Sequence, residues 1–214
     1  MHVFDKISDI GVVPVVAIDD PAKAVDLGNA LLDGDLPIAE ITFRTDAAAD
    51  AIAAMSTGCP DMLVGAGTVL TASQVITAKQ TGSKFGLAPG FDPAVVKAAI
   101  NADLPFAPGI MTPTDLQAAL AINCKFMKFF PAGAAGGPEI LRNIAAPFLH
   151  TGIGFNPTGG VKLTNMDQWL SLPFVKAVGG TWIATQKDIA EGNWSAISQN
   201  AREAVARAQD IRGA

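Results

Sequence analysis

Short apolar runs recur about every 20 to 25 residues along the chain, and this spacing constrains the fold more than any other feature. Eight such runs occur: GVVPVVAI (11–18), IAEITF (38–43), LVGAGTVL (63–70), KFGLAPG (84–90), PFAPGI (105–110), CKFMKFF (124–130), GIGFNPTGG (152–160) and VKAVGGTWI (175–183). Each run is followed by a stretch that can be helical. Strands that alternate with helices are typical of α/β proteins with a parallel sheet.

Capping residues indicate where several of these helices begin. Three pairs place a capping side chain before a proline that suits the first helical turn: Asp20-Pro21, Asp92-Pro93 and Thr112-Pro113. Gly137-Pro138 is a weaker signal of the same kind. The last stretch, from about Asn193 to Ile211, carries apolar residues at helical spacing. The chain therefore supplies a helix start after several of the expected strands.

Eight strand–helix units without a linker predict a (β/α)8 TIM barrel, built as a single domain that spans residues 1–214. An open, doubly wound parallel sheet is the competing architecture. The chain lacks a GxGxxG dinucleotide fingerprint, a Walker loop and a GxSxG elbow. In a barrel, functional residues are expected where the strands end and the following loops begin.

Charge and hydropathy exclude several classes of partner. The net charge is −5 and no basic cluster occurs, so neither nucleic acid nor an anionic membrane is expected as a partner. No apolar run approaches the roughly 18 residues needed to span a bilayer. The N-terminal MHVFDKISDI contains no apolar segment of the kind found in signal peptides. We therefore expect a soluble, cytoplasmic protein.

The residues that most often bind metals are scarce. The chain has two histidines, His2 and His150, and two cysteines, Cys59 and Cys124, which are far apart and form no metal or redox motif. A site with several histidine ligands is therefore not available. We expect no metal and no cofactor.

The run at 38–44 carries three polar residues on one face. Side chains alternate along a strand, so Glu40, Thr42 and Arg44 share a face, and Ile41 and its apolar neighbours share the other. The apolar face suits the surrounding helices, so the polar face points into the barrel. Buried charges need partners. Either Glu40 and Arg44 form an internal structural pair, or both serve a site.

The run at 124–130 places a lysine among apolar residues. Lys128 shares a face with Phe126 and Phe130, and Lys125 lies on the opposite face. An apolar setting disfavours the ammonium form, and a lysine held in this way is a nucleophile toward carbonyl groups. The opposite register would turn Lys125 inward. Pro131 ends the strand and favours Lys128, because Lys128 lies nearer the expected catalytic end.

Small residues follow several of the expected strands. Gly65-Ala66-Gly67-Thr68 and Ala88-Pro89-Gly90 leave room for a ligand, and Thr68 adds a hydroxyl group. Glycine pairs occur in the stretches Pro157–Gly160 and Gly179–Thr181, after the seventh and eighth runs. Barrels often bind phosphate at these two places through backbone N–H groups.

Together these motifs resemble those of the family of aldolases that act on 2-keto-3-deoxy-6-phosphogluconate (KDPG) and often also on 4-hydroxy-2-oxoglutarate (KHG). The matching segments keep the family's order along nearly the whole chain: EITFRT (40–45), GAGTVL (65–70), APG (88–90), PG (108–109), KFFPA (128–132), PTGG (157–160) and GGTW (179–182). The resemblance implies a homotrimeric (β/α)8 barrel and a metal-free Schiff-base aldolase with a small 2-keto acid as substrate.

The resemblance also implies a role for each matching residue. Lys128 would be the Schiff-base lysine and Glu40 the general acid–base group. The remaining residues would bind substrate: Arg44 and Thr68 at the pyruvate carboxylate, Pro89 and Phe130 as walls, and Thr158, Gly159, Gly160, Gly180 and Thr181 at the phosphate end. Two positions depart from many members: Gly133 stands where an acidic residue is common, and Thr181 where serine is common.

Three rival functions remain open from the sequence. A phosphosugar isomerase, epimerase or decarboxylase uses the same fold, but its metal-dependent forms need histidine ligands that this chain lacks. A magnesium-dependent pyruvate aldolase needs carboxylates alone. A non-catalytic protein that binds phosphorylated sugar acids would keep the glycine pairs and would have no need of Glu40 and Lys128.

Overall fold

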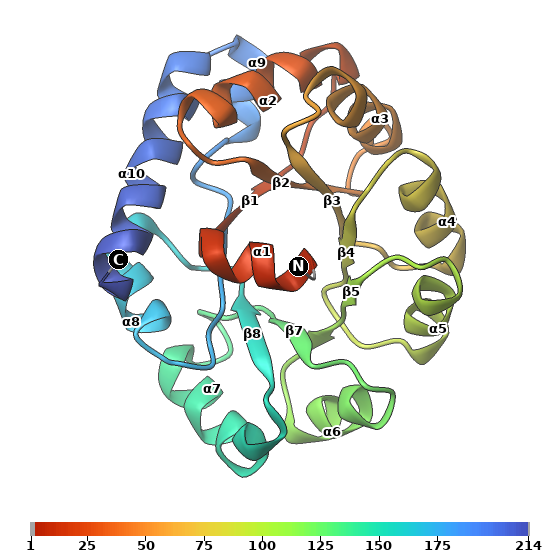
Figure 1. Cartoon of the computed structure of the whole chain (residues 1–214), viewed down its shortest axis with the longest axis vertical. Coiled ribbons are helices and arrows are strands. Elements are labelled where there is room, and N and C mark those ends of the chain that lie inside the picture. The colour runs from red at the N-terminus through yellow and green to blue at the C-terminus, as the bar shows by residue number, and fades with distance from the viewer. Residues whose placement is uncertain (1–2, 214) are drawn as a thin grey trace.

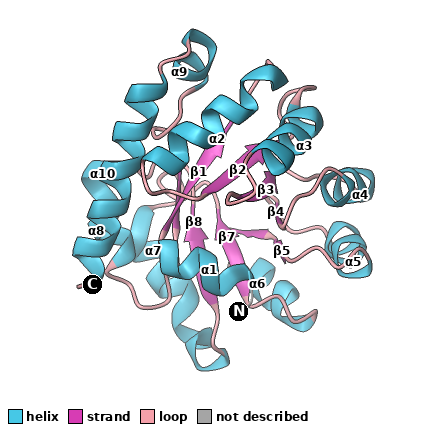
Figure 2. Ribbon diagram, turned by 45° about the horizontal axis from the view of Figure 1, so that its top comes forward, coloured by secondary structure: helices cyan, strands magenta, loops and turns pink. Residues whose placement is uncertain are grey.

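The computed structural model describes residues 3–213 of the chain. Strands occupy the centre and helices surround them (Figures 1 and 2). The strands are β1 (Val12–Val16), β2 (Ile38–Thr42), β3 (Leu63–Gly67), β4 (Phe85–Leu87), β5 (Phe106–Ala107), β6 (Gly109–Ile110), β7 (Phe126–Phe129), β8 (Gly154–Pro157) and β9 (Val178–Gly180). All pairs between them are parallel.

The helices follow the strands in the alternating order that the sequence predicts. The α-helices are α1 (Val3–Ile10), α2 (Ala24–Asp33), α3 (Ala48–Gly58), α4 (Ala72–Gln80), α5 (Pro93–Asn101), α6 (Pro113–Ala121), α7 (Gly137–Ala145), α8 (Met166–Leu170), α9 (Gln186–Glu191) and α10 (Trp194–Arg212). Short 3-10 turns are η1 (Pro21–Lys23), η2 (Ala146–Thr151) and η3 (Leu163–Asn165). Of these described helices, none has the length and apolar character to cross a membrane.

The strands pair in two groups rather than in one continuous ladder. Six strands pair in the order β5-β4-β3-β2-β1-β9, and three in the order β6-β7-β8. Between the groups, isolated bridges join Phe155 to Val175 and Thr158 to Gly179. At the other junction, β5 and β6 belong to the same apolar run and are separated by Pro108, which has no backbone N–H to donate.

The predicted α/β class with parallel strands is confirmed, and each of the eight apolar runs contains a strand. The fifth run differs from the prediction, since Pro108 divides it into β5 and β6. The regular pairing is interrupted at both junctions between the two groups of strands. A complete ring of eight strands therefore stays a prediction.

The capping signals mark the helix starts with one exception. Asp92 accepts a hydrogen bond from the backbone N–H of Ala94 at the start of α5, and Thr112 forms a capping box with Asp115 at the start of α6. The expected helix at Asp20-Pro21 begins as the 3-10 turn η1 and becomes α-helical only at Ala24. The predicted last helix is α10.

The sequence did not predict α1, which lies across the amino ends of the strands (Figure 1). Its Phe4 ring stacks on Phe126 at the start of β7, with ring centroids 4.5 Å apart. Ile7 is buried, and the Arg212 guanidinium at the end of α10 donates to the Ser8 carbonyl. Because α1 covers the amino ends, the opposite, carboxyl ends of the strands are the place for a site.

Candidate active site

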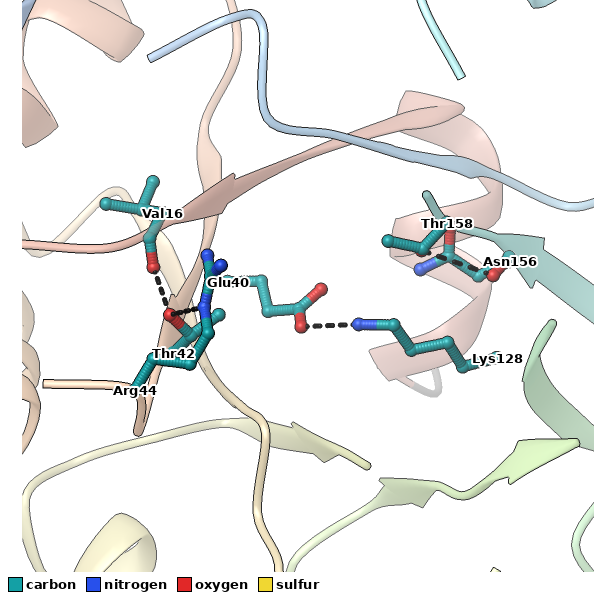
Figure 3. A network of polar contacts seen from close by, with 7 residues as sticks. All are labelled: Val16, Glu40, Thr42, Arg44, Lys128, Asn156 and Thr158. Carbon is teal, nitrogen blue, oxygen red and sulfur yellow. Dashed lines mark hydrogen bonds and ion pairs between the residues drawn. The ribbon is translucent and has the colours of Figure 1, made fainter. Parts of the chain in front are cut away.

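Lys128 of β7 and Glu40 of β2 form a buried ion pair in the centre of the molecule (Figure 3). The lysine Nζ lies 2.9 Å from the glutamate Oε1, and the two side chains are 5% and 0% exposed. Phe129, next to Lys128 on the strand, is fully buried on the opposite face and packs against Trp169 of α8. Lys125 is exposed. The register with Lys128 inward is therefore the one that the chain adopts.

The aromatic neighbour Phe130 lies beside the amine of this pair. The Lys128 Nζ is 5.8 Å from the centre of the Phe130 ring. Glu40 Oε2, the second oxygen of the carboxylate, is buried and has no hydrogen-bond partner among residues 3–213. The site therefore joins an amine, a carboxylate with one oxygen left over, and an aromatic wall.

Gly67 at the end of β3 makes room for the Glu40 carboxylate. A Cβ atom at this position would lie 2.2 Å from Glu40 Oε1 and 2.6 Å from its Cγ. The two strands pair in parallel register, with Thr42 opposite Gly67. The small residues at 65–67, interpreted from the sequence as room for a ligand, thus also provide the space that lets Glu40 reach Lys128.

Thr42 and Arg44 form a second polar chain beside the ion pair. The Thr42 hydroxyl donates to the Val16 carbonyl at 2.7 Å, and the Arg44 Nε donates to the Thr42 hydroxyl oxygen at 3.0 Å (Figure 3). Among the ion pairs of the described residues, Glu40 is paired with Lys128 and not with Arg44. The structural Glu40–Arg44 pair considered from the sequence therefore does not form.

A cavity of about 120 Å³ lies above the ion pair, at the carboxyl ends of the strands. Most of the predicted site residues line it: Arg44, Thr68, Pro89, Lys128, Phe130, Thr158, Gly159, Gly160 and Thr181. A cavity of this size has room for several water molecules or for a small ligand.

Two of the predicted site residues do not line the cavity, and four residues outside the predicted set do line it. Glu40 is fully buried beside Lys128, and Gly180 faces the Trp182 ring, which a Cβ atom at that position would overlap. The additional lining residues are Val15, Thr42, Val161 and Gly179. Of these four, Thr42 was already expected to face inward, because it lies two residues after Glu40 on the same strand. Gly179 packs against the Thr158 hydroxyl, and no local sequence signal distinguishes it from Gly180.

The loops after β7 and β8 are joined by backbone hydrogen bonds. The N–H of Ala132 donates to the Thr158 carbonyl, and the N–H of Gly133 donates to the Gly159 carbonyl, both at 2.8 Å. Gly159 and Gly160 have φ angles of 91° and 84°, in the region that favours glycine. The glycine pair is thus held against the strand end that carries Lys128.

A second, larger cavity of about 670 Å³ lies near α1 and includes Phe4, Phe126, Lys125 and Lys176 in its lining. Neither Lys128 nor Glu40 contributes to it. No group of three or more His, Cys, Asp or Glu side chains suited to a metal ion occurs in the described part of the chain, and His2 lies outside that part. The small cavity is therefore the candidate active site, because Lys128 lines it and Glu40 is paired with Lys128 directly beside it.

Comparisons with known proteins identify similar sequences and structures. The model of the aldolase family described as KDPG and KHG aldolase matches residues 3–200. The 2-dehydro-3-deoxy-phosphogluconate aldolase of Haemophilus influenzae is 38% identical over 204 residues, which cover 95% of this chain and 95% of that protein.

Two solved structures are similar along most of their length. The KDPG aldolase of Legionella pneumophila, with pyruvate captured as a covalent carbinolamine intermediate, has a TM-score of 0.88 at 34% identity and covers 93% of this chain and 96% of its own. The aldolase of Zymomonas mobilis ZM4 with 3-phosphoglycerate has a TM-score of 0.86 at 33% identity and covers 96% of both chains.

Proposed function

The chain belongs to the KDPG and KHG aldolase family, and from that premise we propose that Lys128 is its Schiff-base nucleophile and Glu40 its acid–base group. The reaction is the class I aldol cleavage of KDPG to pyruvate and glyceraldehyde 3-phosphate, with cleavage of 4-hydroxy-2-oxoglutarate to pyruvate and glyoxylate as the second activity. The observation that carries the assignment is the buried 2.9 Å contact between Lys128 Nζ and Glu40 Oε1.

Glu40 first takes a proton from the Lys128 ammonium, and the free amine then attacks the C2 carbonyl of the keto acid. The carbinolamine loses water to form an iminium, which accepts the electron pair of the C3–C4 bond when that bond breaks. Glu40 takes the proton of the C4 hydroxyl and later protonates the enamine carbon, so one carboxylate serves successive steps. Hydrolysis of the pyruvyl iminium then frees the lysine.

Arg44 and Thr68 bind the carboxylate of the substrate in this proposal. The Arg44 Nε is already held by Thr42, which orients the guanidinium at the cavity and leaves its other N–H donors for two oxygens of a carboxylate. Pro89 and Phe130 form the walls around the pyruvyl group. These residues are all at the carboxyl ends of parallel strands, where barrels carry their chemistry.

The phosphate end of the substrate lies at Gly159, Gly160 and Thr181, with Thr158 and Gly180 beside them. Backbone N–H groups and a hydroxyl can hold a phosphate without a basic side chain. The Zymomonas protein, described with 3-phosphoglycerate, supports a phosphorylated ligand for this end. We further propose that the strands close into one eight-stranded barrel in a single domain, residues 1–214, and that the chain assembles as a homotrimer.

Trapping with borohydride tests the proposed nucleophile. Pyruvate with borohydride should inactivate the protein and add one pyruvyl-derived group, which peptide mapping places on Lys128. Lys125→Arg is the matched control, since Lys125 is exposed three residues away, and this variant should still be labelled. A label on Lys125, or no label, contradicts the proposal and favours a magnesium-dependent aldolase or a non-catalytic binder of phosphorylated sugar acids.

A further inference from the structure

Asn156 of β8 is a buried polar residue to which the mechanism above gives no role. Its side chain is 0% exposed, and neither the Nδ2 nor the Oδ1 of its amide has a hydrogen-bond partner among the described residues. Asn156 stands directly opposite Lys128 in the parallel pairing of β7 and β8. Paired residues of adjacent strands project to the same face, so both side chains enter the interior together (Figure 3).

An asparagine in this place is unfavourable for stability on its own. A buried donor or acceptor without a partner costs free energy that an apolar side chain of the same shape would not. The protein has one such amide directly beside its nucleophile. Buried polar groups without protein partners are commonly satisfied by a buried water molecule.

The ion pair of Lys128 and Glu40 offers groups that can bind such a water. Glu40 Oε2 is a buried acceptor without a protein partner. The Lys128 ammonium has three N–H donors, and its hydrogen bond to Glu40 Oε1 uses one of them. Thr158, two residues beyond Asn156 on the same face, lines the cavity, which places Asn156 one step deeper along β8 than the cavity.

We propose that Asn156 is a positioning residue whose amide holds a water molecule between Glu40 Oε2 and Lys128. This water is released when the carbinolamine becomes the iminium, and it is consumed when the iminium is hydrolysed. The inference rests on the proposed Schiff-base function. In the forward step, the carbinolamine C–O bond breaks, the hydroxyl takes a proton from Glu40 and leaves as water, and the nitrogen lone pair forms the C=N bond.

The reverse step frees the product and needs the same water. Its oxygen attacks C2 of the pyruvyl iminium, one of its protons passes to Glu40, and the C=N electron pair returns to the nitrogen of Lys128. The Asn156 Oδ1 accepts a hydrogen bond from the water's other O–H, whose proton stays on the oxygen, and the Asn156 Nδ2–H donates a hydrogen bond to the water oxygen. This arrangement puts the nucleophile and its base in reach of each other before each hydrolysis.

A pulse–chase experiment tests this role. The protein is loaded with labelled pyruvate and chased with unlabelled pyruvate, and the remaining adduct is trapped with borohydride at successive times. In Asn156→Leu the labelled adduct should decay about tenfold more slowly than in the parent, which corresponds to the loss of about one hydrogen bond. The midpoint of urea unfolding should be unchanged or higher, because the orphaned amide is gone.

Matched variants separate this role from a structural one. Ser83→Ala removes another buried hydroxyl without a protein partner, from the turn before β4, and should leave adduct decay unchanged. Asn156→Ser keeps a donor and an acceptor and should recover part of the rate. If Asn156→Leu does not fold, Asn156→Val, which suits a strand, takes its place.

Failure of the water-positioning role and failure of the proposed Schiff-base function give different results. Suppose that the parent protein traps pyruvate on Lys128, but the labelled adduct of Asn156→Leu decays at a rate within twofold of the parent rate. The water-positioning role is then wrong and the proposed function stands. The same holds if Ser83→Ala slows decay as much as Asn156→Leu. If the parent does not trap pyruvate at all, the proposed function itself is wrong.

Discussion

Lys128 and Glu40 are 88 residues apart in the sequence, yet Lys128 Nζ and Glu40 Oε1 are 2.9 Å apart in the folded chain. Both side chains are almost completely removed from solvent. Removing one partner of a buried ion pair leaves an uncompensated charge. Such pairs contribute little net stability, because the cost of taking two charges out of water offsets their attraction. The pair lies beside a cavity lined by Arg44 and Thr68, and this position supports the proposed catalytic role.

Glu40→Gln should lower turnover by about 10²–10⁴-fold, the usual contribution of a general acid–base group. The amide keeps the shape of the side chain but cannot exchange the proton. Slow trapping of pyruvate on Lys128 should persist. The measurement is steady-state cleavage beside borohydride labelling, with exposed Glu203→Gln as the control. Near-normal turnover would make Glu40 a structural partner of the lysine.

Gly67→Ala should lower turnover without changing any reactive group. The added methyl would lie 2.2 Å from Glu40 Oε1, so the carboxylate must move away from Lys128. We expect at least about a tenfold loss, because misplaced reacting groups are costly. Gly90→Ala is the control, since a Cβ atom there meets nothing within 4 Å. Equal turnover in the two variants would show that the carboxylate tolerates the displacement.

Thr181→Val should discriminate between the two substrates. Valine keeps the shape of threonine but cannot donate a hydrogen bond to a phosphate. The parent should prefer KDPG to 4-hydroxy-2-oxoglutarate in kcat/KM by about tenfold or more, and the variant should lose most of that preference. Rates with 4-hydroxy-2-oxoglutarate should stay the same. An equal fall with both substrates would place Thr181 outside the phosphate end.

Prolonged chelation should leave the cleavage rate unchanged, because an iminium supplies the electron sink that a metal supplies in the magnesium-dependent enzymes. The measurement compares turnover before and after dialysis against a strong chelator. Loss of activity that magnesium restores would favour the rival function based on carboxylates and a metal.

Asp188 at the start of α9 should contribute stability that depends on pH. The Thr185 hydroxyl, which donates at 2.5 Å, and then the Asn193 amide hold the pKa of this carboxyl below its ordinary value of 3.8. Because the pKa is lower in the folded state, ionised Asp188 adds to the free energy of unfolding above about pH 3.8. This contribution is lost as the pH falls through the folded-state pKa.

Urea unfolding of the parent and of Asp188→Asn, measured from pH 7 down to pH 2, checks this expectation. The stability difference between them should shrink below the unfolded-state pKa, since the parent carboxyl then becomes neutral too. A difference that stays constant over the whole range would mean that the charge of Asp188 does not contribute.

Most of the order of strands and helices along the chain could be predicted from the sequence, because it depends on local patterns. The eight apolar runs, the caps at Asp92 and Thr112 and the helix at the end of the chain all follow from periodicity and side-chain hydrogen bonds within a few residues. The eight-residue α1 was missed although Val3, Phe4, Ile7 and Ile10 recur at helical spacing, because strand–helix alternation requires no helix before the first strand. Its Phe4 is held by Phe126, far along the chain.

The sequence alone determined which residue types were available for the site, and through strand alternation that Glu40 and Thr42 share a face. Only the tertiary structure decided that Lys128 and not Lys125 turns inward, that Glu40 pairs with Lys128 rather than Arg44, and that Gly179 rather than Gly180 lines the cavity. It also revealed the unpartnered amide of Asn156. Alternation is a property of one strand, whereas partners depend on how distant strands align, and that alignment is set by packing over the whole chain.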